Sequence, residues 1–195
     1  MKYRRTNPLA LAVLALLWER PMHPYELAAT MRERHQENVI KLNYGSLYTV
    51  VDGLAKAELI RHVEFSREGK RPERSVYALT PEGRAELDSW LRELIAVPAR
   101  EYPQFEAGIS MVGLLPPDEA QLLLTRRAAA VEEHITALTT LTAQLKERGL
   151  PRLAWIELDY RMTMLRAEHA WLTSFTEATR DGTVDGHQFW VEAHR

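Results

Sequence analysis

The sequence predicts a mainly α-helical protein with one small β-hairpin, and three patterns predict it. Apolar residues recur at spacings of three and four through most of the chain, which is the period of an amphipathic helix. The period changes to two in the short segments 60–65 and 75–80, which flank a turn containing Gly69 and Pro72. After residue 117 the helical spacing becomes long and regular, as in helices that pack along one another.

Three predicted helices open the chain. Asn7 and Pro8 cap and begin the first, over 9–18, which is apolar almost all round and is therefore predicted to be buried. The second helix is predicted over 24–36 and the third over 46–59. The third turns an apolar stripe inward, made of Leu47, Val50, Val51 and Leu54.

The hairpin and a fourth helix complete a domain that we predict over 1–97. Thr80 caps the fourth helix, because a Thr followed by Pro is a common helix start. Three helices followed by a hairpin is the element order of a winged helix-turn-helix domain. The apolar face predicted for the fourth helix comprises Leu87, Trp90, Leu91, Leu94 and Ile95.

The rest of the chain predicts a linker with a short helix over 98–117, and a helical domain over 118–195. Asp118 is predicted to cap a long helix that ends near Gly149, and a second long helix runs over 152–180. These helices carry more apolar surface than one antiparallel pair buries, so we predict a two-fold homodimer. The residues predicted to hold the dimer are Leu124, Val131, Ile135, Leu138, Leu145, Leu165 and Leu172.

Charge is distributed unevenly along the 195 residues. The whole chain has a net charge of −2, but residues 1–84 carry +4 and residues 85–195 carry −6. Such asymmetry indicates that the first part meets an anion. There is no cysteine, which excludes disulfides and thiol nucleophiles and fits a cytoplasmic protein, and no apolar run is long enough to span a membrane.

The anion that fits this arrangement is DNA. An α-helix enters the major groove and presents side chains to base edges, while a hairpin beside it places cations against phosphates. The third helix is the predicted recognition helix, with Ser46, Tyr48, Thr49 and Asp52 on its outer side. The hairpin turn supplies the cations Arg67, Lys70, Arg71 and Arg74.

Three motifs, PMHPYEL, YGSLYTVVDGLAKAELI and RPERSVYALTPEGRAEL, resemble successive motifs of the PadR family of transcriptional regulators. The resemblance covers residues 8–92, and continues more loosely over 105–180 with the larger PadR subfamily. It implies a homodimeric, cytoplasmic, sequence-specific DNA-binding regulator, commonly a repressor released by a small molecule. Pro24 stands where the family usually has Gly, between His23 and Tyr25. The predicted DNA-binding residues are His23, Tyr25, Asn43, Ser46, Tyr48, Thr49, Arg67, Lys70, Arg71 and Arg74.

Several of these residues have structural alternatives. His23 and Tyr25 can cap the second helix, Ser46 can cap the third, and Tyr48 can cover the edge of the core. For the whole protein, one alternative is a winged helix that docks proteins without binding DNA, and another is a ligand-binding or enzymatic helical domain. No pair of histidines has HxxxH spacing, and no GxSxG or phosphate loop occurs. The sequence therefore predicts no enzyme, catalytic residue, metal site or cofactor.

Aromatic residues in the last long helix suggest an effector site. A small aromatic or hydrophobic molecule could stack on such side chains, although packing in the core or in a dimer is the alternative. The residues concerned are Trp155, Met162, Met164 and Trp171.

Overall fold

The structure is a computed structural model that describes residues 5, 7–36, 40–63 and 75–195. The chain divides into two compact units, Met1–Arg100 and Glu101–Arg195, each with its own hydrophobic core. Helices dominate both units, and a two-stranded antiparallel hairpin lies in the first. The predicted fold class, mainly α with a small β-hairpin, is therefore confirmed. Within the described ranges, no helix combines the length and the apolar character that crossing a membrane requires.

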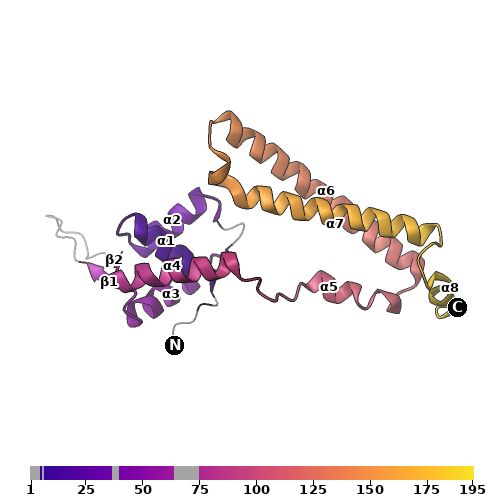
Figure 1. Cartoon of the computed structure of the whole chain (residues 1–195), viewed down its shortest axis with the longest axis horizontal. Helices are drawn as coiled ribbons and strands as arrows, with labels where there is room; N and C mark the ends of the chain where they lie inside the picture. Colours follow the sequence, from indigo (N-terminus) through magenta and orange to yellow (C-terminus); the bar gives the residue numbers. More distant parts are fainter. Residues whose placement is uncertain (1–4, 6, 37–39, 64–74) are drawn as a thin grey trace. The chain divides into compact units, whose positions relative to one another are not determined.

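The first unit has the predicted order of three helices, a hairpin and a helix (Figure 1). The elements are α1 (Pro8–Glu19), α2 (Pro24–Glu33), α3 (Tyr44–Lys56), β1 (Ile60–Val63), β2 (Val76–Leu79) and α4 (Pro81–Ala96).

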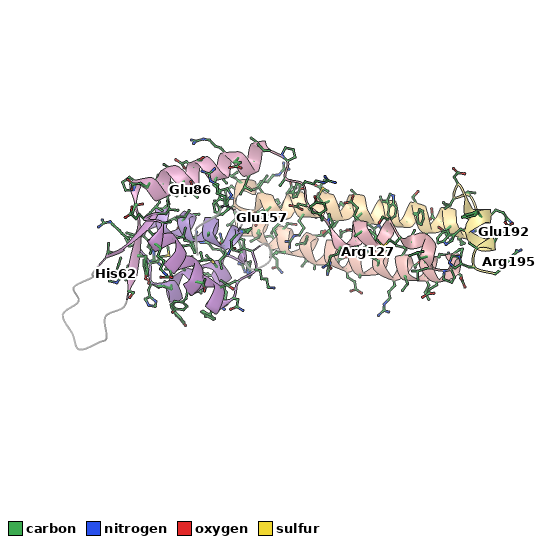
Figure 2. All side chains as sticks on the ribbon, turned by 90° about the horizontal axis from the view of Figure 1, so that it is seen from below. His62, Glu86, Arg127, Glu157, Glu192 and Arg195 are labelled. Carbon is green, nitrogen blue, oxygen red and sulfur yellow. The ribbon has the colours of Figure 1, made fainter. Side chains whose placement is uncertain are left out.

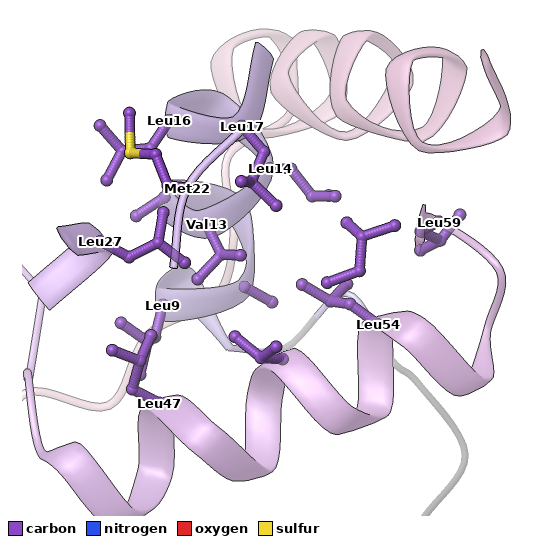
Figure 3. Close-up of a cluster of buried hydrophobic side chains, with 14 of the residues drawn as sticks. Leu9, Val13, Leu14, Leu16, Leu17, Met22, Leu27, Leu47, Leu54 and Leu59 are labelled. Carbon is purple, nitrogen blue, oxygen red and sulfur yellow. The ribbon is translucent and has the colours of Figure 1, made fainter. Parts of the chain in front are cut away.

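Helix α1 is the centre of this unit. The Asn7 side chain caps it by accepting a hydrogen bond from the Leu9 N–H at 3.0 Å, as predicted. Its apolar residues are buried on almost every side, because α3, β2 and α4 all pack against it. Figure 3 shows these side chains meeting Leu27 of α2 and Leu47 and Leu54 of α3. Each fully buried leucine contributes about 1.5–3 kcal/mol, so α1 organises the unit.

The hairpin is anchored to the turn between α1 and α2. Ile60 pairs with Leu79 and Val63 with Val76 in the antiparallel register. Met22 adds a one-residue third strand, because its N–H and carbonyl each bond Tyr77 at 3.0 Å. The sequence carries no signal for this bridge, since one residue is too short to show a period of two.

Helix α3 ends three residues before its predicted end. Glu58 adopts a left-handed conformation, with φ of 60°, and the Leu59 N–H bonds back to the Leu54 carbonyl at 3.0 Å. This closes the helix after Lys56 and directs the chain into β1. Because a residue other than glycine rarely takes this conformation, the sequence carried no signal for the stop.

The prediction for α4 is only partly correct. Thr80 does cap the helix, accepting a hydrogen bond from the Gly83 N–H at 3.0 Å, and Leu87 and Trp90 are buried. However, Leu91, Leu94 and Ile95 are 44 %, 48 % and 79 % exposed. The helical period identified a common face, but the core around α1 covers only its first part.

The second unit is built on a pair of long helices. Its elements are α5 (Gln104–Ile109), η2 (Val112–Leu114), α6 (Pro117–Glu147), η3 (Arg152–Trp155), α7 (Ile156–Arg180) and α8 (His187–Glu192). Helices α6 and α7 run antiparallel (Figure 1). The prediction that Asp118 caps the first long helix is wrong: Pro116 holds the cap position without a side-chain bond, and Asp118 lies in the first turn. Proline at the helix start moved the boundary by two residues.

The predicted heptad seam packs within a single chain. Leu124, Val131, Ile135 and Leu172 form one buried cluster, with Leu165 beside it. These are five of the seven residues predicted to hold the dimer, and their part in a dimer stays a prediction.

Polar contacts flank that cluster. Arg127 of α6 (Figure 2) bonds Glu168 of α7 at 2.6 Å and stacks on the Phe105 ring of α5 at 3.5 Å. Thr142 is buried in the seam, and its hydroxyl donates to the Leu138 carbonyl at 2.9 Å. At the other end, the Trp190 indole N–H of α8 donates to the Leu115 carbonyl at 2.7 Å. The pair is thus held by apolar packing along its length and by specific bonds at its side and end.

We predict that Gly83→Ala destabilises the first unit by about 3 kcal/mol. A Cβ at this position would lie 1.9 Å from the Leu59 carbonyl oxygen, and backbone must move to admit it. Gly53→Ala, in α3 of the same unit, is the matched control, because a Cβ there meets nothing within 4 Å. The control should change stability by no more than about 1 kcal/mol. Urea denaturation followed by circular dichroism measures both, and equal effects would contradict the prediction.

Candidate nucleic-acid interface

The start of α3 is set by Asn43. Its side-chain oxygen accepts a hydrogen bond from the Gly45 N–H at 2.9 Å, and its backbone carbonyl accepts the first helical bond, from Leu47, at 2.9 Å. The alternative that Ser46 caps this helix is wrong, because Ser46 lies inside the first turn and leaves its side chain exposed. Ser46 therefore stands beside the positive end of the helix, where an anion is favoured.

The two faces of α3 separate as predicted. Leu47, Val51 and Leu54 are buried and Val50 packs against the same core. The outer face carries Tyr48, which is 50 % exposed, with Thr49, Asp52 and Lys56. The Thr49 hydroxyl donates to the Gly45 carbonyl at 2.9 Å, and Lys56 Nζ lies 2.5 Å from an Asp52 oxygen. Packing of the inner stripe thus holds a polar, exposed face in one orientation.

Helix α2 begins with a histidine cap. His23 Nδ1 accepts a hydrogen bond from the Tyr25 N–H at 3.0 Å, and the Glu26 carboxylate accepts one from the His23 N–H at 2.9 Å. This is a capping box, so the capping alternative for His23 is confirmed. The Tyr25 ring is 63 % exposed and remains available for contact.

An unpredicted contact joins α2 to α3. The Arg32 guanidinium lies 4.6 Å from the centre of the Tyr44 ring, and Arg32 Nη1 donates to the Tyr44 hydroxyl at 2.5 Å. The pair spans the connection between the two helices and fixes the end of α2 against the start of α3. No sequence pattern signals a pair twelve residues apart whose meeting depends on the path of a turn.

The wing is described only at its base. Arg67, Lys70, Arg71 and Arg74 lie outside the described residues. At the base, His62 of β1 (Figure 2) and Tyr77 of β2 meet edge to face with ring centres 5.8 Å apart. Because Tyr77 also holds the Met22 bridge, the strands leading to the wing are fixed on the core that supports α3.

The four predicted effector residues do not form one cluster in the structure. Trp155 is buried at the turn between α6 and α7, under the Lys146 ammonium at 5.5 Å. Trp171 lies sixteen positions later, about 24 Å along a helix, where it stacks on Phe175 with ring centres 5.2 Å apart. Between them, Met162 contacts Thr139 of α6 through its sulfur, and Met164 is exposed. Within the described part of the chain, no cluster of three metal-ligating side chains occurs.

Chemically, the first unit presents a helix with an anion-favouring N-terminus and a row of hydrogen-bonding side chains. Such a row suits the edges of bases in a major groove, and the helix start suits a phosphate beside it.

Comparison with known proteins identifies the fold. Residues 13–89 match the model of the transcriptional regulator PadR-like family, which confirms the resemblance drawn from the motifs. The chain is similar to Bacillus subtilis PadR in complex with operator DNA, with a TM-score of 0.70, 20 % identity, and coverage of 89 % of this chain and 99 % of that chain. It is also similar to Bacillus subtilis PadR in complex with p-coumaric acid, with a TM-score of 0.72, 19 % identity, and coverage of 88 % of this chain and 98 % of that chain.

A third similar structure is the Vibrio cholerae virulence activator AphA, with a TM-score of 0.57, 14 % identity, and coverage of 93 % of this chain and 99 % of that chain. At these identities the three structures show a shared fold. Among curated protein sequences, none matches the chain.

We predict that Asn43→Ala destabilises the first unit by about 1 kcal/mol, because it removes the cap of α3. Ser46→Ala is the matched control and should cost less than about 0.5 kcal/mol, since its hydroxyl makes no capping bond. Urea denaturation compares the two variants. A larger loss of unfolding free energy for Ser46→Ala than for Asn43→Ala would show that Ser46 caps the helix instead.

Proposed function

We propose that this protein, whose residues 13–89 belong to the transcriptional regulator PadR-like family, binds DNA sequence-specifically and controls transcription. The observation that carries the proposal is the outer face of α3. Its residues are polar, exposed and held in register by a buried inner stripe, and the matched segment contains the whole of α3 and the hairpin. The structural likeness to a regulator bound to operator DNA supports the same function.

Recognition would divide between α3 and the wing. Tyr48 and Thr49 would meet base edges in the major groove, and Ser46 and Asn43 would lie near the first phosphates. The wing cations Arg67, Lys70, Arg71 and Arg74 would meet the phosphate backbone beside the groove. His23 would act by holding the start of α2, and Tyr25 by an exposed contact to the backbone.

We propose a homodimer that uses the exposed face of α7. In the single chain Leu172, one of the residues predicted to hold the dimer, has no exposed surface. A second apolar stripe on α7 remains exposed at spacings of three and four, and a second copy would cover it. It comprises Ile156, Tyr160, Met164 and Trp171, with Ala167 between. The two recognition helices would then meet half-sites of a near-palindromic operator, about 34 Å or a multiple apart.

Repression released by a small aromatic or hydrophobic effector is the finer form of this proposal. The structural likeness to a regulator in complex with p-coumaric acid supports an effector of this class. Of the four predicted residues, Met164 and Trp171 are exposed in the single chain and belong to the stripe proposed for the dimer, so an effector that contacts them would bind at that interface. Trp155 is buried at the turn between α6 and α7.

The alternative, a winged helix that docks proteins, makes a different prediction for DNA. A docking module has no need of a cationic wing, and it should bind neither operator nor random DNA. Binding of the purified protein to DNA that it selects from a random pool therefore separates the two functions.

The first prediction of this proposal concerns the wing. Lys70→Ala combined with Arg71→Ala should remove about four phosphate contacts per dimer and flatten the slope of log K against log salt by about 3 to 4 units. Affinity should fall alike for selected and random DNA at low salt, with sequence preference retained. Binding titrations at several salt concentrations measure the slope. A slope equal to that of the parent would show that these cations do not meet phosphates.

The second concerns the dimer. Met164→Asp should weaken it by about 3 kcal/mol or more, because an unpaired charge would be buried in the α7 interface. Leu122→Asp is the control, since Leu122 is an exposed leucine on α6, outside the α7 stripe. Light scattering at micromolar concentration reads the mass. A monomeric parent would overturn the dimer, and a dimeric Met164→Asp would place the interface elsewhere.

A further inference from the structure

The carboxylate of Asp52 stands on the face of α3 that the proposed function turns toward DNA. Its side chain is 63 % exposed. Val51 and Leu54, on either side of it along the helix, are buried in the core around α1. The rotation of α3 is therefore fixed, and Asp52 points outward with Tyr48 and Thr49.

A carboxylate in this position repels the phosphates of DNA, unless a specific hydrogen bond to the DNA offsets the repulsion. In the free protein Lys56 neutralises it across one helical turn, with 2.5 Å between Nζ and the carboxylate. Exposed pairs of this kind contribute little to stability, so folding does not explain the acid. The reason for a carboxylate here must be sought in what the helix contacts.

We propose that Asp52 reads the amino group of a cytosine in each half-site, and that its charge penalises DNA that lacks this group. A carboxylate only accepts hydrogen bonds, and the donors in the major groove are cytosine N4 and adenine N6. Adenine N6 lies beside the N7 acceptor, which repels a carboxylate, while guanine and thymine present acceptor oxygens. Cytosine is the base whose edge offers a donor without a neighbouring acceptor, so a carboxylate selects it.

The neighbouring glycine supplies an independent observation. Gly53 lies in the interior of α3, where glycine is unfavourable relative to alanine. A Cβ added there meets nothing within 4 Å inside the chain, in contrast to Gly83, where the Leu59 carbonyl leaves no room. Packing within the chain therefore does not require this glycine. The glycine leaves the helix backbone beside Asp52 open, which suits the close approach of a DNA strand.

The inference rests on the proposed function and is tested with the whole chain. DNA is selected from a random pool by the parent, by Asp52→Asn and by Asp52→Ala, and the preferred base at each position is compared. The parent should prefer cytosine at one position per half-site. Asp52→Asn should shift that preference to adenine, because an amide bonds N6 and N7 together. Asp52→Ala should lose the preference, with discrimination falling about 5- to 150-fold.

A matched control separates this role from a general charge effect. Asp88→Asn removes an acid from another ion pair of the same spacing, the half-buried Arg84–Asp88 on α4, and should leave the selected sequence unchanged. Both Asp52 variants should bind random DNA more tightly than the parent does, and their thermal unfolding should match the parent's within about 2 °C. With the parent protein, replacing the selected cytosine by 2-pyrimidinone, which lacks the amino group, should lower affinity as Asp52→Ala does.

The outcomes keep the two proposals apart. A parent that binds no DNA overturns the proposed function, and this inference with it. If the parent selects a sequence, and both Asp52→Asn and Asp52→Ala select that same sequence, this inference alone is overturned. The role of Asp52 is likewise overturned if the parent shows no cytosine preference, or if the pyrimidinone site binds as well as the cytosine site.

Discussion

Burial of α1 on almost every side is the constraint on which the first unit depends. A helix that is apolar almost all round must be covered on all sides, and α3, β2 and α4 pack against it. Because each of these elements also has a polar face, covering α1 determines which side of each faces outward. The outer face of α3 is thus a consequence of packing on α1.

Local bonds then refine what burial begins. Asn43 fixes where α3 starts, and the pair of Arg32 with Tyr44 fixes that start against the end of α2. The Met22 bridge to Tyr77 fixes the base of the hairpin on the same core. Each of these bonds is individually modest, about 0.5–1.5 kcal/mol. Together they give α3 and the base of the hairpin one common support.

The second unit follows a simpler rule. The seam of α6 packs against α7 of the same chain, so the buried cluster forms without a second copy. The apolar side chains that remain exposed include the stripe on α7, Leu122 of α6 and Phe189 of α8. A heptad pattern in the sequence identifies a helix that packs along another. It does not identify whether the other helix belongs to the same chain, because both cases bury the same side chains.

Periodicity, capping residues and motifs are local signals, and they were enough to predict the longer helices, the hairpin and their order, the inner stripe of α3 and the family resemblance, but not α8. The same signals misplaced the caps at Ser46 and Asp118, where several good capping residues or prolines lie within a few positions. The helical period also predicted a longer buried face on α4 than the structure has. Periodicity shows which residues share a face of a helix, but not what packs against that face. Tertiary packing alone settled which stripes are covered, that Met22 joins the hairpin, and that Arg32 meets Tyr44. These contacts depend on the paths of turns and on the volume around α1, which no local pattern encodes.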